Sequence, residues 1–443
     1  MSRVVARLRP LVLIAALGLL AACGGSSSPS GGADASGTVG ALDPNEKVTI
    51  VWWHGQEQEA ADILSGLARE YEKLHPNVTI DESSGASTTD GLLQKVSAGF
   101  ASDSYPDISY AFGSWATELG LSGKMLNITK NVADPSVKWD DFPKSARETA
   151  TVNGQVIGFP AVVDNLGIIY NKDLFDKAKL AYPTNNWTWD DFRSAAKTLT
   201  NPAEKIYGTA YPVSGSEDTT WRFWPQLWQN GGQILNDDET KAEFNSQAGV
   251  DALEYWRQLA QEDKSVYLDQ NGERYGPLFY KGAIGMMISG PWMLYDLKQQ
   301  NVNYGVTYLP GTNGDHQTIS GPDIWALYNH DDAQRAAASY DFIKWLTEPA
   351  QDARWNIAYG NLPLRQSEGS SKAFQAYVKK YPGAQVFFDN LNNAITPRPT
   401  VEGYVGLSRS IGTAIDNVLL GNEDPQEQLD KAAAQSDVEL AGG

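Results

Sequence analysis

Residues 47–112 decide the fold and read KVTIVWWHGQEQEAADILSGLAREYEKLHPNVTIDESSGASTTDGLLQKVSAGFASDSYPDISYAF. Runs rich in apolar and β-branched residues predict strands at 47–53, 77–81 and 106–112. Between them, apolar residues recur at three- and four-residue spacing over 56–74 and 90–100, which predicts two helices. The order strand, helix, strand, helix, strand indicates a parallel sheet with helices on its faces.

The same alternation returns after Gly158. Strand-like runs are expected at 159–171, 282–292, 304–310 and 323–329, and helical patterns at 190–199, 248–261 and 331–346. The body shows no internal repeat and no heptad array. We therefore expect an α/β protein with two lobes, between which the chain crosses more than once.

The start of the chain predicts export. Three arginines and no acid stand among the first ten residues, and LVLIAALGLL follows at 11–20, a pattern typical of a secretion signal. This apolar run has only about half of the ~20 residues that a membrane-spanning helix needs. We expect residues 1–22 to be a signal peptide.

The segment that follows predicts a lipid anchor. LAACG at 20–24 resembles the lipobox of bacterial lipoproteins, in which the Cys receives a diacylglycerol. We expect Cys23 to be lipidated and to hold the protein at the outer face of the cell membrane. Because Cys23 is the single Cys, no internal disulfide is possible. Residues 23–44 are rich in Gly and Ser and predict a flexible tether.

The charge excludes some classes of partner. The sequence has 54 acidic and 35 basic residues and a formal net charge of −19, which becomes −22 without the three leader arginines. Such an excess repels phosphate backbones and anionic lipid headgroups, so we expect no nucleic-acid partner and no membrane contact beyond the lipid. The sequence has no Gly-x-Ser-x-Gly, Walker or Gly-x-Gly-x-x-Gly motif, and its four His have no metal spacing. We expect no cofactor and no metal.

Five blocks in order carry a family resemblance. They are VTIVWWHG (48–55), YPDISYAFGSW (105–115), GFPAVVDNLGIIYNKDLF (158–175), FYKGAIGMMISGPWMLYDL with VNYGVTYLPG (279–297 and 302–311), and AASYDFIKWLTEPAQDARWNIAYGNLPLRQS (337–367). In these blocks the sequence resembles the extracellular solute-binding proteins of family 1, the sugar-binding group that includes maltose-binding protein and serves ABC importers.

The resemblance implies a periplasmic-binding-protein-like fold. Two α/β lobes would be joined by a hinge of several crossings, with the ligand in the cleft between them and closure on binding. We expect the N-terminal lobe at 45–160 and 309–347, and the C-terminal lobe at 161–308 and 348–443. A monomer that delivers a mono- or oligosaccharide to ABC permease subunits is the expected function.

The resemblance also implies the ligand contacts. The residues that match family positions are His54, Gln56, Glu57, Ser114, Asp164, Trp221, Trp292 and Tyr404. Asp323 and Arg398 are added because they are polar residues on loops expected to face the cleft. Sugars present hydroxyls and weakly apolar ring faces, which planar polar groups and aromatic rings bind.

Three alternatives stay open. A lipid-anchored glycoside hydrolase would use two carboxylates, for which Asp164 with Glu217 or Asp218 can be considered, although the sequence does not fix their separation. A binder of a glycerol phosphodiester would use Arg398. An adhesin or sensory lipoprotein would be expected to show Asn/Gly-rich β-repeats, which are absent. The expectation we favour is a sugar binder without catalysis.

Overall fold

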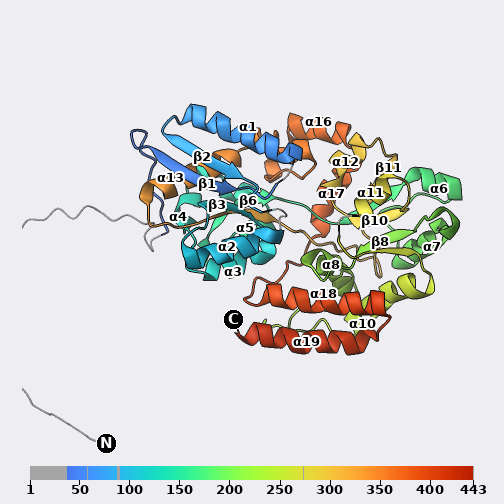
Figure 1. Ribbon diagram of the computed structural model, residues 1–443. Coiled ribbons are helices and arrows are strands. Elements are labelled where there is room, and N and C mark those ends of the chain that lie inside the picture. The colour runs from blue at the N-terminus through green and yellow to red at the C-terminus, as the bar shows by residue number, and fades with distance from the viewer. Residues whose placement is uncertain (1–36, 57, 87–89, 273, 443) are drawn as a thin grey trace, which may run out of the picture.

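A computed structural model describes residues 37–56, 58–86, 90–272 and 274–442 (Figure 1). The predicted signal peptide, the predicted lipidation site Cys23, the first part of the tether and the candidate Glu57 lie outside these residues. Within them, no helix is both long and apolar enough to span a membrane.

The predicted parallel sheet is confirmed in the N-terminal part. β1 (Val48–Trp53) pairs in parallel with β2 (Val78–Ser83) and β3 (Ile108–Ala111), and these strands alternate with α1 (Gln58–Leu74) and α2 (Asp90–Ser102). The sheet order is β2-β1-β3-β12-β6. The remaining strands β12 (Asp323–Leu327) and β6 (Gly158–Val162) come from distant sequence, and β12 runs antiparallel to both β3 and β6.

The core of this lobe is aromatic. Trp52 of β1 makes edge contacts with Trp325 of β12 and with Phe342 of α13 (Ala333–Leu346), at ring-centroid distances of 5.4 and 5.1 Å. All three side chains are fully buried. These contacts fix a returning strand and its following helix onto the first sheet, because edge-to-face aromatic pairs combine large buried area with a preferred geometry.

The C-terminal lobe has its own sheet. β7 (Gly167–Asn171) pairs antiparallel with β10 (Met286–Ser289) and β11 (Tyr304–Thr307), and β8 (Thr209–Pro212) pairs in parallel with β9 (Val266–Asp269). Backbone hydrogen bonds of 2.9 Å from Gly285 to Tyr207 and from Met286 to Gly208 place β8 beside β10. The buried strand-like run at 159–171 therefore contains two strands, β6 and β7, which belong to different sheets.

The other elements complete the two lobes. The shorter ones are α3 (Ala116–Leu121), α4 (Thr129–Val132), β4 (Thr151–Val152), β5 (Gln155–Val156), α5 (Lys144–Thr149), α6 (Lys172–Ala178), α8 (Glu217–Trp221), α9 (Trp224–Gln229), α11 (Tyr275–Tyr280), α12 (Met293–Gln299), α14 (Pro349–Asp352), α15 (Asn356–Tyr359), α16 (Lys372–Lys380) and α17 (Ala384–Asn390). The longer ones are α7 (Trp189–Leu199), α10 (Gln247–Arg257), α18 (Tyr404–Gly421) and α19 (Pro425–Gly442). The last two pack against each other along the lower edge of the molecule (Figure 1).

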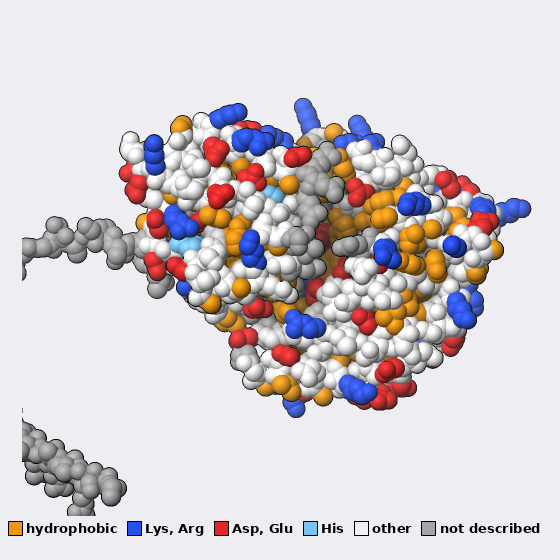
Figure 2. All heavy atoms as spheres, viewed as in Figure 1, with side chains coloured by type: hydrophobic (Ala, Val, Ile, Leu, Met, Phe, Trp, Pro, Cys, Tyr) orange, Lys and Arg blue, Asp and Glu red, His pale blue; other side chains and the backbone are white. Residues whose placement is uncertain are grey.

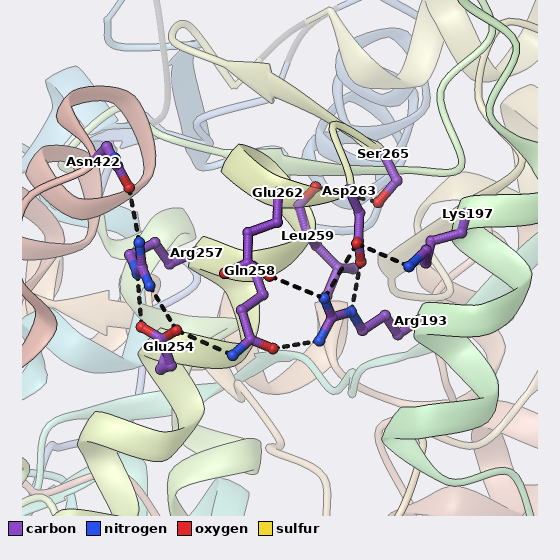
Figure 3. Close-up of polar contacts among 10 residues, drawn as sticks. All are labelled: Arg193, Lys197, Glu254, Arg257, Gln258, Leu259, Glu262, Asp263, Ser265 and Asn422. Atoms are coloured by element: carbon purple, nitrogen blue, oxygen red, sulfur yellow. Dashed lines mark hydrogen bonds and ion pairs between the residues drawn. The ribbon is translucent and has the colours of Figure 1, made fainter.

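Helix α10 continues as a π-helical turn over Gln258–Glu262, so the helix predicted at 248–261 is confirmed. A polar network surrounds this turn (Figure 3). Arg193 of α7 donates from Nε to Asp263 Oδ2 at 2.5 Å, and Arg257 donates from Nη1 to Asn422 Oδ1 at 2.9 Å. The network joins α7, α10 and the end of α18 on the outer side of the lobe.

The described part of the chain has one hydrophobic core at the first sheet and two at the second. Leu309 and Ile319 pack in the core of the second sheet, whereas Trp355 and Leu364 pack in the core of the first. The lobe boundaries expected at 160/161, 308/309 and 347/348 stay a prediction. From these contacts we propose that the chain enters the first lobe between residues 319 and 324 and leaves it for good between Leu364 and Phe374, since Phe374 packs with Ile169 and Met287 of the second sheet.

Candidate functional site

The crossing segments carry two buried carboxylates. Asp164 lies between β6 and β7, and Asp323 begins β12. The Tyr110 hydroxyl, at the end of β3, donates to Asp323 Oδ2 at 2.5 Å, and the Gly113 N–H donates to Oδ1 at 3.1 Å. The Gly321 N–H donates to Asp164 Oδ1 at 3.0 Å. Two chain crossings and one strand end are thus held together by carboxylate acceptors.

Burial decides how these carboxylates ionise. It raises the pKa of Asp164 well above its usual value, and the nearby negative charge of Asp323 raises it further. Burial also raises the pKa of Asp323, to about 6, although the hydrogen bond from Tyr110 and the positive charge of Arg398 oppose the shift. Burial therefore favours the protonated form of Asp164, in which the carboxyl can donate a hydrogen bond, and it shifts the pKa of Asp323 in the same direction.

Two tryptophans stand beside this pair. The rings of Trp221, at the end of α8, and Trp292, just before α12, have centroids 5.8 Å apart and planes inclined by 35°. A Cβ added to Gly321 would lie 2.8 Å from Cζ2 of Trp221 and 3.1 Å from Oδ1 of Asp164. Only a glycine therefore lets the indole approach the crossing and its carboxylate this closely. A ring sandwiched between two faces needs ~7 Å, two contact distances, so the tryptophans contact each other and do not enclose a ligand ring.

Two polar atoms near these groups lack partners. The Ser114 Oγ and the Trp221 Nε1 are buried and form no hydrogen bond with the described part of the chain. Ser114 lies in the short 3-10 helix Gly113–Trp115, directly after β3. Because a buried donor without a partner is unfavourable, each is available to a polar group of a bound molecule.

Arg398 and Tyr404 meet at a carboxylate that was not among the predicted contacts. Glu217 Oε1 accepts hydrogen bonds from Arg398 Nη1 at 2.7 Å and from the Tyr404 hydroxyl at 3.3 Å, and Ser408 Oγ donates to Oε2. The Tyr404 hydroxyl also accepts from Trp224 Nε1 at 3.1 Å. The guanidinium of Arg398 is therefore neutralised inside the protein.

His54 and Gln56 have contacts within the first lobe. His54 Nε2 lies 3.1 Å from Glu82 Oε2, and its Nδ1 accepts from the Gln56 N–H at 3.1 Å. Burial lowers the pKa of His54, while the charge of Glu82 opposes this shift. Both ring nitrogens are thus engaged, and a ligand contact at His54 or Gln56 stays a prediction. Glu57 lies outside the described residues.

The structure brings most of the predicted residues into one region. Hydrogen bonds, a ring contact and electrostatic interactions connect Asp164, Asp323, Trp221, Trp292, Arg398 and Tyr404. Sequence reasoning missed Tyr110 as a partner of Asp323. The end of β3 could have indicated it, since ligands of open α/β sheets bind beyond the carboxyl ends of strands.

A cavity of about 1290 Å³ is lined by residues of both lobes. Its walls come from 143–151, 228–239 and 391–400. Of the predicted residues, Arg398 contributes to these walls, and so does Ser320. The wall of this cavity thus includes Ser320, whose neighbour Gly321 lies close to Trp221 and Asp164. The surface between the lobes is visibly hollowed in Figure 2.

No group of three or more His, Cys, Asp or Glu that could hold a metal ion occurs among the residues that the structure describes. What the lobes bring together is a set of hydrogen-bonding side chains and aromatic rings. Two α/β lobes with such a set at their crossings define a bilobed binding protein of the periplasmic type.

Comparison with known proteins gives the family. Residues 66–383 match the model of the bacterial extracellular solute-binding proteins, and the chain belongs to this family. The sn-glycerol-3-phosphate-binding periplasmic protein UgpB of Pectobacterium atrosepticum is 23% identical over 409 residues, which cover 88% of this chain and 91% of the relative.

Two solved structures illustrate the fold. The ABC substrate-binding protein Lmo0181 from Listeria monocytogenes, in complex with cycloalternan, has a TM-score of 0.80 at 23% identity and covers 89% of this chain and 100% of its own. The cyclic alpha-maltosyl-1,6-maltose binding protein from Arthrobacter globiformis has a TM-score of 0.75 at 26% identity, with 90% and 100% covered. The expected periplasmic-binding-protein-like fold is confirmed.

Proposed function

We propose that this protein captures a carbohydrate outside the cytoplasm and delivers it to the permease of an ABC importer. One observation carries the proposal. Asp164, Asp323, Trp221 and Ser114 supply hydrogen-bonding groups and an aromatic face where the lobes meet, and two of their polar atoms have no partner among the described residues. Sugar hydroxyls can pair with such atoms, and sugar rings can lie on an indole.

The ligands named for related binding proteins support a carbohydrate as the ligand of this protein. The Listeria protein was solved with cycloalternan, and the Arthrobacter protein is a cyclic maltosyl-maltose binder. A maltotriose-binding protein of Pyrococcus abyssi is 21% identical over 307 residues. Ligand binding would favour a closed arrangement of the lobes, because contacts from both sides are made better there than in an open form.

Thermal shift against a panel of neutral mono- and oligosaccharides tests the proposal, followed by calorimetric titration of each hit. A ligand at a hundred times its Kd stabilises the folded form by about 2.7 kcal/mol, so a binder raises Tm measurably. Saturable binding of a sugar supports the proposal. A panel that leaves Tm unchanged at millimolar sugar contradicts it.

We also propose that the protein is not an enzyme. Glu217 is hydrogen-bonded to Arg398, Tyr404 and Ser408, which favours a structural carboxylate over a general acid of a glycoside hydrolase. Incubation with the bound oligosaccharide should release no reducing ends. Turnover at a rate above that of buffer would overturn this part of the proposal.

A glycerol phosphodiester is the second candidate ligand, because UgpB of Mycobacterium tuberculosis was solved with glycerophosphocholine and other UgpB relatives bind the monoester sn-glycerol 3-phosphate by name. The ion pair of Arg398 argues against it, since the guanidinium is already neutralised. The mature protein is proposed to be a monomer held at the outer face of the membrane by a lipid on Cys23.

A further inference from the structure

Glu217 is a half-buried acceptor at the edge of the candidate site. It takes hydrogen bonds from three residues that come from the loop before α18 and from α18 itself: Arg398, Tyr404 and Ser408. The side chains of Arg398 and Glu217 are only 10% and 18% exposed. A pair so well shielded from water holds its geometry, because either partner left alone would be a buried unpaired charge.

The charges around this pair are mainly negative. The carboxyl groups of Asp323 and Asp164 interact electrostatically with Arg398, and the negative charge of Glu217 raises the pKa of Asp323. A second arginine, Arg222 at the end of α8, is buried and forms an ion pair with Asp218. Neither arginine thus offers an uncompensated positive charge to a ligand.

Phosphate recognition needs a positive charge that is not already paired, and these two ion pairs leave none at Arg398 and Arg222. Arginine binds phosphate through parallel N–H donors, and the attraction is strong in a site that excludes water. A phosphate approaching Arg398 would have to replace Glu217, and the displaced carboxylate would stay buried near it. Like charges held close in a low-dielectric site repel strongly.

We propose that Glu217 determines the charge selectivity of the cleft: by neutralising Arg398 it makes the site reject anionic ligands and accept uncharged polyols. The inference rests on the proposed function only in taking this region as the ligand site. It names Glu217 as a specificity-determining residue and uncharged sugars as the ligand class.

The test compares anion binding by the wild type and by Glu217→Gln, with full-length protein solubilised in detergent. Glutamine keeps the shape and can still accept from Arg398, but it leaves the guanidinium with an unbalanced charge. The probe is sn-glycerol 3-phosphate, and its binding is measured by calorimetry and by thermal shift. We expect the variant to bind it at least tenfold more tightly than the wild type does.

Two controls isolate the pair. Glu402→Gln removes a negative charge from an exposed position in the loop before α18 and should leave sn-glycerol 3-phosphate binding unchanged. The double variant Glu217→Gln with Arg398→Gln should lose the gain, because the binding cation is then absent. Tm without ligand reports whether each variant is folded.

The wild-type measurement keeps the inference falsifiable even if Glu217→Gln does not fold. Wild-type protein that binds sn-glycerol 3-phosphate as tightly as any neutral sugar overturns the inference. So does a folded Glu217→Gln variant without gain, or one whose gain survives loss of Arg398. If no neutral sugar binds but the variant gains the phosphate ligand, the proposed function fails while the role of Glu217 stands.

Discussion

Asp323 shows how a single residue can join the ends of distant segments. It begins β12, yet its two carboxylate oxygens accept from Tyr110 and Gly113, which lie more than 200 positions earlier. Its partial protonation follows from burial, which raises its pKa to about 6. At the scale of residues, then, the site depends on acids whose charge is set by their surroundings and not by their type.

Trp292 is the first residue to test. Its ring is partly exposed and touches that of Trp221, so it can offer the other side to a sugar. Trp292→Ala should weaken sugar binding by about 1 kcal/mol or more, roughly fivefold, on the scale of truncations at binding hot spots. Calorimetric titration measures the change. Unaltered affinity would remove Trp292 from the site.

A matched control exists for this substitution. Tyr182 is 39% exposed and lies against Tyr170 and Phe175, beside α6 on the outer part of the second lobe. Tyr182→Ala also removes an aromatic side chain and should leave the affinity as it is. Weakening by both variants would instead indicate a general loss of stability.

Gly321 is the second residue to test. Because an added Cβ would meet the Trp221 ring at 2.8 Å, Gly321→Ala should push the indole away from Asp164. Overpacking of this kind costs typically about 1–3 kcal/mol, and we expect sugar affinity to fall about tenfold while the fold persists. Isothermal titration and Tm separate the two effects.

The control for Gly321 is Gly66 in α1. No atom lies within 4 Å of a Cβ added there, so Gly66→Ala should leave binding unchanged and should not lower Tm. A Gly321→Ala protein that binds as tightly as the wild type would show that the indole is not held by this close approach.

At the scale of elements, sequence pattern predicted what is local. The helices near 56–74 and 90–100 and the strands at 47–53 and 77–81 follow from periodicity, and the structure confirms them to within a few residues. The run at 159–171 shows the limit of this reasoning. Both β6 and β7 are fully buried, so no change of periodicity marks the crossing between them.

The candidate site was predictable only in part for the same reason. Asp164 and Trp292 were identified through blocks of sequence that resemble a family, whereas Glu217 and Tyr110 depend on contacts between distant segments. Nothing local in the sequence around Glu217 indicates that it pairs with Arg398, 181 positions later. Such pairs are set by tertiary packing and not by pattern.

We expect Glu368, in the segment after α14, to make the free energy of unfolding depend on pH. Glu368 is buried beside Asp352 and Arg365, and its pKa is raised to about 8, first by burial and then by the charge of Asp352. A carboxyl whose folded pKa lies above its unfolded value stabilises the protein below the unfolded pKa. This contribution is lost as the pH rises through about 8.

Glu368→Gln removes this titration. Between pH 6 and pH 8.5 the wild type should lose free energy of unfolding relative to the variant, on the order of 2 kcal/mol. Urea unfolding at both pH values measures the difference, and this window lies at or above the pKa of about 6 of Asp352. Parallel pH profiles for wild type and variant would contradict the prediction.

At the scale of the whole molecule, the two sheets depend on segments that return from afar. β12 of the first sheet follows the entire second sheet in sequence, and α18 and α19 lie against the second lobe after the chain has visited the first once more. Because the chain passes between the lobes several times, the candidate ligand site lies at the crossing segments. Movement of either lobe therefore alters the contacts that both lobes make at this site. The closing motion that we propose follows from this connectivity.

Anchoring is the last prediction, and it concerns the chain as a whole. The described body begins at Gly37, some 14 residues after Cys23 in a Gly/Ser-rich segment. If a diacylglycerol on Cys23 is the anchor, Cys23→Ser should move the protein from the membrane fraction to the soluble one, because two acyl chains are what give stable attachment. Sugar affinity should stay the same, since the ligand region lies in the folded body. Fractionation followed by immunoblotting measures the first effect and calorimetry the second.

A Cys23→Ser protein that stays with the membranes would show that another contact holds it there. Release together with a changed affinity would show that the anchor and the body are not independent.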